Sequence, residues 1–291
     1  MSPPLTVGVL GAGTMGSGIA VVAARAGHRT VVRDIDDDRV AAGLDRVCRF
    51  LDRSASLGKL SSEALAAAKA GLTGTTSLER LADCDVVVEA VFEDTALKQE
   101  TFGALDEVCR PDTLFHTNTS TLSATAIAAG SVRSERVVGT HYCNPAPLMT
   151  LVEVVRARQT SDDAYARTLA FLHGVGKTTV TTADSPGFIV NRFLIPWENS
   201  CIRALAEGHG TVESIDAAVT GALGHPMGPF QLLDIVGLDI HRAVSLSLYE
   251  QLRDPRFAPP PLVDQMIAAG HLGRKTQRGF HTYDDARHFG T

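Results

Sequence analysis

Hydrophobic residues in the first 184 positions of the chain alternate between short β-rich runs and longer segments with helical periodicity. The short runs have the length of strands, and the segments between them repeat their apolar residues at helical spacing. This alternation predicts an α/β region with a parallel, doubly wound sheet. After an apolar strand that precedes Gly11, the predicted strands are residues 30–33, 85–91, 114–118, 137–142, 151–156 and 178–182.

Residues from about 37 to 70 depart from this alternation because they carry no strand signal. The segment is rich in alanine, leucine, arginine and aspartate. It is long enough for two antiparallel helices that meet around residues 56–59. We expect a helical excursion that overhangs the ligand crevice of the sheet.

The pattern changes again at Ser185, where the β-rich runs end. Ser185 and Pro186 are a good N-cap and first-turn pair, and apolar periodicity continues from them to Gly208. Glycine and proline separate the further helical stretches, which are residues 212–221, 228–233, 239–252 and 261–269. The sequence therefore predicts two domains, with the sheet in residues 1–184 and a small all-α C-terminal domain in residues 185–291.

Three glycines follow the first strand at the spacing of a dinucleotide-binding turn. Gly11 permits the tight turn, Gly13 lets a diphosphate approach the backbone, and Gly16 lets the next helix pack closely on the strand. The N-terminus of that helix offers free N–H groups to the phosphates. A second strand ends at Asp34, whose carboxylate suits the adenosine ribose and repels a 2′-phosphate. We expect a Rossmann-type domain that binds NAD, with Arg33 as the feature that favours NADP instead.

Composition and charge narrow the class of partner. Hydrophobic residues make up 44% of the chain, and the net charge of −6 with a pI near 5.9 argues against nucleic-acid or anionic-membrane partners. The five cysteines are scattered, so neither a disulfide framework nor a metal site is expected. The chain runs from Met1 directly into the first strand, and no apolar run is long enough to span a bilayer. We expect a soluble, cytoplasmic protein.

Polar residues near the carboxyl ends of the predicted strands are the candidates for chemistry, because open parallel sheets bind ligands there. Ser120 lies just past one strand, His141 lies at the end of the next, and Glu153 lies within an otherwise apolar strand. A buried glutamate needs a partner. Bonded to one ring nitrogen of His141, it would leave the other nitrogen free as a base. The alternative is a structural histidine and an ordinary glutamate at the sheet edge.

Eight short motifs occur in order along nearly the whole chain. They are GAGTMGSGIA at 11–20, VEAVFE at 88–93, NTS at 118–120, HYCNPAPLM at 141–149, LVEV at 151–154, SPGFIVNR at 185–192, HPMGPF at 225–230 and GRKTQRGF at 273–280. Together they closely resemble the 3-hydroxyacyl-CoA dehydrogenase family, including the bacterial 3-hydroxybutyryl-CoA dehydrogenases. The resemblance implies reversible, NAD-dependent oxidation of the 3-hydroxyl group of a short-chain 3-hydroxyacyl-CoA. It also implies a homodimer formed through the helical second domain.

The resemblance further implies roles for individual residues. His141 matches the catalytic base and Glu153 the carboxylate that orients it. Ser120 and Asn191 match the residues that hold the reacting oxygen and orient the substrate, and Lys59 matches a substrate-binding lysine in the helical excursion. The cofactor-binding positions are Gly11, Gly13, Thr14, Met15, Gly16, Asp34, Glu93, Lys98, Asn144 and Lys275.

Several positions depart from the family pattern and leave the carrier of the acyl group open. Phe50 stands where many relatives have a serine that contacts the nucleotide end of the carrier, and Gln277 replaces the glycine usual in the closing motif. One alternative is therefore the same oxidation on a hydroxyacyl group tethered to acyl carrier protein, or on a free hydroxy acid. Another is a non-catalytic structural relative, which the full set of catalytic residues disfavours. Further departures are Thr121, Tyr142, Cys143 and His281.

Overall fold

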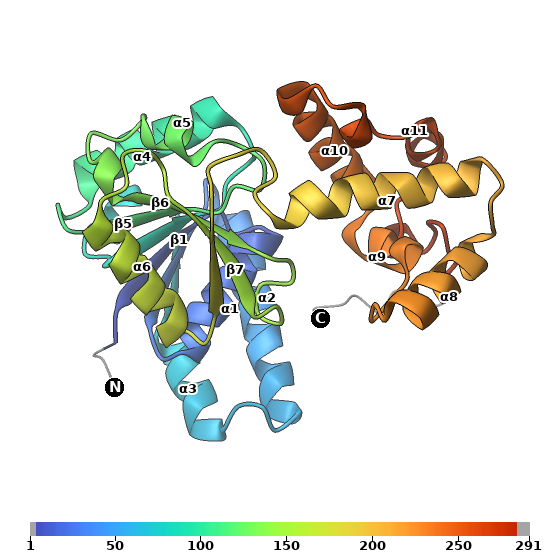
Figure 1. Ribbon diagram of the computed structural model, residues 1–291. Coiled ribbons are helices and arrows are strands. Elements are labelled where there is room, and N and C mark those ends of the chain that lie inside the picture. Colours follow the sequence, from blue (N-terminus) through green and yellow to red (C-terminus); the bar gives the residue numbers. More distant parts are fainter. Residues whose placement is uncertain (1–3, 284–291) are drawn as a thin grey trace. The chain divides into compact units, whose positions relative to one another are not determined.

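The computed structural model describes residues 4–283, and the chain passes from one compact unit to a second between Phe188 and Ile189. Figure 1 shows a sheet flanked by helices in the first unit and helices alone in the second. Of the predicted domains 1–184 and 185–291, residues 1–3 and 284–291 lie outside the described residues. Within residues 4–283, no helix has the length and apolar character needed to cross a membrane.

One eight-stranded sheet organises the first unit, in the order β3-β2-β1-β4-β5-β6-β7-β8. Every residue of β4, β5 and β6 is buried, so these strands form the centre of the fold. The strands are β1 (Thr6–Leu10), β2 (Arg29–Arg33), β3 (Leu72–Thr75), β4 (Val86–Glu89), β5 (Leu114–Thr117), β6 (Val137–Tyr142), β7 (Leu151–Val155) and β8 (Thr178–Thr182).

Helices cover both faces of the sheet, because successive residues of a strand point to opposite sides. In β4, Val86 and Val88 pack into an apolar cluster with α1 and α6, whereas Val87 packs into a second cluster with α4 and α5. The helices are α1 (Thr14–Arg25), α2 (Asp37–Ser56), α3 (Ser62–Ala70), α4 (Thr95–Val108), α5 (Ala124–Ala128) and α6 (Asp162–Gly174). The expected Rossmann-type, doubly wound fold is confirmed (Figure 1).

Two strands correct the expectation of a fully parallel sheet. β7 runs antiparallel to β6, and β8 runs parallel to β7, so both oppose the other strands. Residues 143–150 connect β6 to β7, and this connection is shorter than the roughly dozen residues that a parallel crossover needs. The chain therefore turns back and β7 pairs antiparallel with β6. β3 is absent from the predicted strands because its sequence, LTGT, is short and is interrupted by Gly74. A Cβ on Gly74 would come within 2.5 Å of a Val40 methyl carbon, so α2 packs directly on this strand.

The segment predicted as a helical excursion contains the helices α2 and α3. Asp36 caps α2 by accepting a hydrogen bond from the backbone N–H of Arg39. Gly58 turns the chain between the helices with a φ of +69°. Gly43 brings α2 against the glycine-rich turn, because a Cβ at this position would lie only 2.6 Å from the Cβ of Ala12. The excursion therefore packs directly on the turn that follows β1.

The described part of the second unit contains the helices α7 (Val190–Ala206), α8 (Val212–Leu223), α9 (Pro229–Val236), α10 (Leu238–Leu252) and α11 (Pro261–Ala268). The predicted helix start at Ser185 and Pro186 is wrong, because α7 begins at Val190. Gly187 with a φ of +80° and Phe188 with a φ of +47° adopt left-handed conformations that interrupt a helix. Phe188 instead packs into an apolar cluster of the first unit.

Gly16→Ala is expected to destabilise the protein more than Gly13→Ala. A Cβ on Gly16 would lie 1.7 Å from the carbonyl oxygen of Gly11, whereas a Cβ on Gly13 would meet nothing within 4 Å. Overpacking of this kind costs about 1–3 kcal/mol. Urea unfolding of both variants measures the difference in the free energy of unfolding, and equal values would contradict the prediction.

Candidate active site

Strands β6 and β7 place a histidine directly opposite a glutamate. His141 and Glu153 are Cα partners in the antiparallel ladder, and Nδ1 of His141 lies 2.7 Å from Oε2 of Glu153. Both are buried, His141 at 7% exposure and Glu153 at 0%. In the tautomer whose Nδ1–H donates to this carboxylate, Nε2 is left as a proton acceptor. Phe188 packs beside the imidazole, with 5.8 Å between the ring centroids.

The loop of residues 143–149, which follows β6, is held by a buried lysine and by α1. Nζ of Lys177 donates hydrogen bonds to the carbonyl oxygens of Ala146 and Met149, each at 2.6 Å. Gly18 lets α1 approach the loop, because a Cβ there would lie 3.2 Å from Cδ of Pro147. Helix α1 begins at the glycine-rich turn and also packs against the loop that follows His141. The same helix therefore contacts both parts of the candidate site.

Ser120 lies in a loop after β5 that is anchored by Glu93. Oε1 of Glu93 accepts hydrogen bonds from the Thr119 hydroxyl at 2.6 Å, from the backbone N–H of Ser120 at 2.7 Å and from that of Thr121 at 3.0 Å. Burial acts to raise the pKa of Glu93, but the charge of Lys98 and these hydrogen bonds prevail and hold the pKa below its ordinary value. Glu93 is therefore ionised at neutral pH.

A buried ion pair connects this loop to the sheet. Nζ of Lys98 lies 2.6 Å from Oε1 of Glu89 and 3.4 Å from Oε2 of Glu93. Lys98 is 1% exposed and Glu89 is 0% exposed. Asn118 extends the network toward His141 by accepting a hydrogen bond from the backbone N–H of Tyr142 at 3.0 Å. Glu89 and Asn118 were not among the site residues predicted from the sequence. The signal that could have found them is their place in the motifs at 88–93 and 118–120.

The glycine-rich turn forms another part of the crevice. Gly11 has a φ of +92°, and a Cβ there would lie 2.5 Å from the carbonyl oxygen of Ala90. Gly13 has a φ of −65° and open space where its Cβ would be. Neither backbone conformation nor packing among the described residues therefore requires glycine at position 13. The open space suits the diphosphate of a dinucleotide. Thr14 and Met15 begin α1 at this point and offer its N-terminus.

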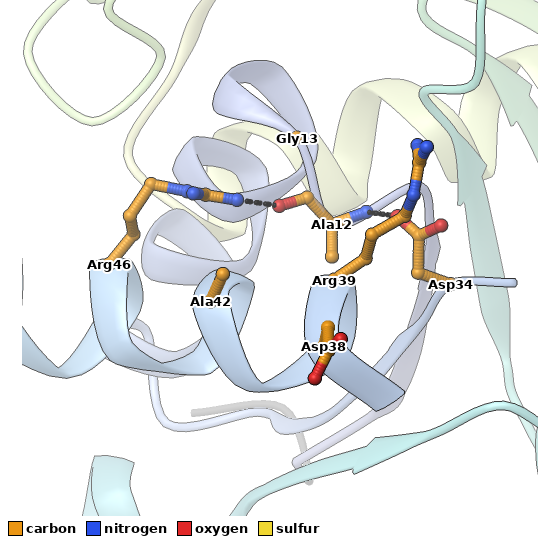
Figure 2. A pocket seen from close by; sticks show the side chains of 7 residues that line it. All are labelled: Ala12, Gly13, Asp34, Asp38, Arg39, Ala42 and Arg46. Carbon is orange, nitrogen blue, oxygen red and sulfur yellow. Dashed lines mark hydrogen bonds between the residues drawn. The ribbon is translucent and has the colours of Figure 1, made fainter. Parts of the chain in front are cut away.

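A cavity of about 340 Å³ adjoins the turn (Figure 2). Oδ2 of Asp34, just after β2, accepts a hydrogen bond from the backbone N–H of Ala12 at 2.6 Å. Nε of Arg33 donates to the carbonyl oxygen of Thr76 at 3.2 Å, so this guanidinium is engaged with the backbone. The cavity thus presents a carboxylate where the adenosine ribose of a dinucleotide would bind. Its lining residues are Ala12, Gly13, Asp34, Asp38, Arg39, Ala42 and Arg46.

Four further predicted site residues lie in other parts of the chain or are exposed. Asn191 lies in the first turn of α7, in the second unit. Lys275 also belongs to the second unit, where Nζ lies 2.5 Å and 2.6 Å from the two carboxylate oxygens of Asp239. Lys59 is exposed between α2 and α3, and Asn144 is exposed in the loop after β6. The roles of these four residues stay predictions.

Comparisons with known proteins cover nearly the whole chain. Residues 6–185 match the family model described as 3-hydroxyacyl-CoA dehydrogenase, NAD binding domain, and residues 187–283 match the model of the C-terminal domain of the same family. A 3-hydroxybutyryl-CoA dehydrogenase of Mycobacterium tuberculosis is 44% identical over 279 residues, which is 95% of this chain and 98% of the relative. One from Bradyrhizobium diazoefficiens is 42% identical over 281 residues, with 97% and 96% coverage.

Solved structures give the same result for the fold. Mycobacterium tuberculosis FadB2 superposes with a TM-score of 0.93 at 43% identity, covering 97% of this chain and all of that one. The (S)-3-hydroxybutyryl-CoA dehydrogenase of Ralstonia eutropha gives a TM-score of 0.90 at 40% identity, with 97% and 100% coverage. The chain is therefore an oxidoreductase with NAD as its cofactor, and it belongs to the 3-hydroxyacyl-CoA dehydrogenase family.

Proposed function

We propose that the protein oxidises the 3-hydroxyl group of a short-chain 3-hydroxyacyl-CoA to the 3-oxoacyl-CoA, reversibly, with His141 as general base and Glu153 as its orienting carboxylate. The observation that carries this proposal is the buried 2.7 Å contact between Nδ1 and Oε2 near the carboxyl end of β6. Support for the substrate class comes from the relatives, which are named 3-hydroxybutyryl-CoA dehydrogenase.

Oxidation of a secondary alcohol removes a proton from oxygen and a hydride from carbon. Nε2 of His141 accepts the hydroxyl proton, and the ionised Glu153 stabilises the imidazolium that forms. NAD, when bound, accepts the hydride. In the reduction, the imidazolium of His141 returns its proton to the oxygen. Glu153 keeps the ring in one orientation in both directions because its hydrogen bond fixes Nδ1.

Ser120 and Asn191 hold the reacting oxygen in this proposal. Hydrogen-bond donors aimed at that oxygen stabilise the negative charge that develops on it. Glu93 supports the role of Ser120, because its hydrogen bond to the backbone N–H of Ser120 gives the residue a defined position. Asn191 is supplied by the first turn of α7.

The residues around the carboxyl ends of β1, β2 and β4 bind the cofactor in this proposal, since a dinucleotide lies across that edge of such a sheet. Asp34 accepts hydrogen bonds from the adenosine ribose, and Gly13 admits the diphosphate. The remaining contacts are Gly11, Thr14, Met15, Gly16, Glu93, Lys98, Asn144 and Lys275.

Coenzyme A is the proposed carrier of the acyl group, with Lys59 as a contact. Lys59 is exposed between α2 and α3, where its ammonium group can meet a phosphate. Phe50 is partly buried against the apolar core of the first unit, so this position offers packing instead of a hydroxyl group. An acyl-carrier-protein thioester or a free hydroxy acid is the alternative substrate.

We further propose that the second unit forms a homodimer and that the protein is cytoplasmic. Phe193 of α7 is 73% exposed, Leu223 of α8 is 64% exposed and Ile240 of α10 is 49% exposed. Apolar side chains exposed on three helices favour association with another surface. The five cysteines are free, which fits a reducing compartment.

His141→Gln is expected to lower turnover by roughly 10²–10⁴-fold, because glutamine cannot accept the hydroxyl proton. NADH affinity, measured by fluorescence titration, should stay within a factor of about two. Steady-state assays with acetoacetyl-CoA and NADH measure turnover. The matched control is His173→Gln, an exposed histidine on α6 that should keep wild-type activity. Near-normal turnover of His141→Gln would remove His141 from its role.

Asp34→Ala is expected to weaken NADH binding by about 10- to 100-fold, the loss for hydrogen bonds to a charged group. NADPH binding should weaken less, because removing the carboxylate also removes its repulsion of the 2′-phosphate. Fluorescence titration with both cofactors measures the ratio. Asp45→Ala, which removes an exposed carboxylate of α2 that pairs with Arg49, is the control. An unchanged preference between the cofactors would contradict the assignment of Asp34.

Acetoacetyl-CoA is expected to be reduced with a kcat/KM at least about tenfold above that of acetoacetyl-acyl-carrier protein or free acetoacetate. NADH absorbance follows all three reactions under the same conditions. A preference for the carrier protein or the free acid would support the alternative substrate, and the absence of activity on every substrate would support a non-catalytic relative.

A further inference from the structure

Arg46 of α2 reaches the glycine-rich turn from outside the sequence motif. Its Nη2 donates a hydrogen bond to the carbonyl oxygen of Ala12 at 2.5 Å, and its Nε donates to the hydroxyl of Ser17 at 3.2 Å. Figure 2 shows the side chain extending from α2 toward the carbonyl group of Ala12. The close packing of α2 on the turn at Gly43 makes this reach possible.

Residue 12 is held between two opposite charges. Its backbone N–H donates to Oδ2 of Asp34 at 2.6 Å, and its carbonyl oxygen accepts from Arg46 (Figure 2). The negative carboxylate faces the positive end of the N–H bond, and the positive guanidinium faces the negative carbonyl oxygen. The two side chains therefore orient the peptide groups that lead into Gly13.

Arg46 also brings a positive charge that pairs with no carboxylate among the described residues. Arg39, the other arginine of the cavity, pairs with Asp36 at 3.0 Å, but within residues 4–283 no carboxylate lies within ion-pair distance of Arg46. A guanidinium has five N–H donors, of which the contacts to Ala12 and Ser17 use two. The first turn of α1 contains no acidic residue. A partly buried cation with free donors, beside a helix N-terminus, suits an anion.

We propose that Arg46 binds a phosphate group of the dinucleotide, at the diphosphate, and so adds a full charge to the N-terminus of α1. The glycine-rich turn supplies only backbone N–H groups and the helix dipole. Guanidinium groups bind phosphate oxygens by charge-assisted hydrogen bonds. The adenosine 2′-phosphate is the other phosphate that this chemistry would fit, and Asp34 in the same cavity disfavours it by repulsion.

The test uses ADP-ribose, which lacks the nicotinamide and so binds without any reaction. Calorimetric titration of the intact protein is expected to show ADP-ribose affinity about 10- to 100-fold lower in Arg46→Met and an intermediate loss in Arg46→Lys, which keeps the charge but not the planar donors. Adenosine affinity should be unchanged, because adenosine carries no phosphate. Raising the ionic strength should weaken ADP-ribose binding to the wild type more than to Arg46→Met.

Arg49→Met is the matched control, since Arg49 lies three residues further along α2 and pairs with Asp45 at 3.1 Å. It should bind ADP-ribose like the wild type. Unchanged ADP-ribose affinity in Arg46→Met would overturn the proposal, and so would equal losses for ADP-ribose and adenosine, which would mean that Arg46 only supports the turn. A loss confined to 2′-phospho-ADP-ribose would overturn the assignment to the diphosphate. If Arg46→Met does not fold, Arg46→Lys replaces it in the test. A loss of ADP-ribose affinity in Arg46→Lys together with salt-sensitive binding by the wild type would then support the proposal, and unchanged affinity in Arg46→Lys would overturn it.

Discussion

Residues 143–150 are too few to carry the chain across a face of the sheet, and the rest of the active-site geometry depends on this constraint. The chain must turn back after β6, so β7 lies antiparallel to it and the ladder sets Glu153 opposite His141. Directly opposed residues of an antiparallel pair point to the same face of the sheet. The 2.7 Å contact between imidazole and carboxylate follows from that register. A parallel strand at this place would require a longer connection and would give a different register.

Paired charges fix the crevice around these two residues. Glu89, Lys98 and Glu93 form a chain of ion pairs from β4 to the loop of Ser120. Glu89 and Lys98 are buried, and buried charges are costly unless each is satisfied, so their contacts with each other and with Glu93 hold the loop in one arrangement. Asp34 and Arg46 act in the same way on the glycine-rich turn, where each binds one side of Ala12. The backbone of this turn is thus positioned by charged side chains.

Much of the fold was predictable because its signals are local. The glycine spacing, the apolar strands and the helical periodicity each involve residues close together in the chain, and these gave the Rossmann-type domain and the helices that follow. The start of α7 was predicted wrongly, because Ser185 and Pro186 have the local character of a helix start while Gly187 and Phe188 adopt positive φ values. The packing of Phe188 into an apolar cluster of the first unit accompanies that conformation, and no local pattern reports such a contact. β3 was not predicted because its four residues are held as a strand by pairing with β2 and by packing against α2, and neither contact is visible in the local sequence.

The sequence by itself determined the class of the protein. Residue types at fixed spacing predicted the glycine-rich NAD turn and Asp34 as its ribose carboxylate. The pair His141 and Glu153 was predicted from a buried glutamate that needs a partner and from the family resemblance. Only the tertiary structure decided how Glu153 meets His141, which charged side chain holds Ser120, and that Arg46 reaches Ala12. The physical reason is that hydrogen bonds and ion pairs require atoms to lie within a few ångströms, and the folded chain brings together residues that no sequence spacing relates.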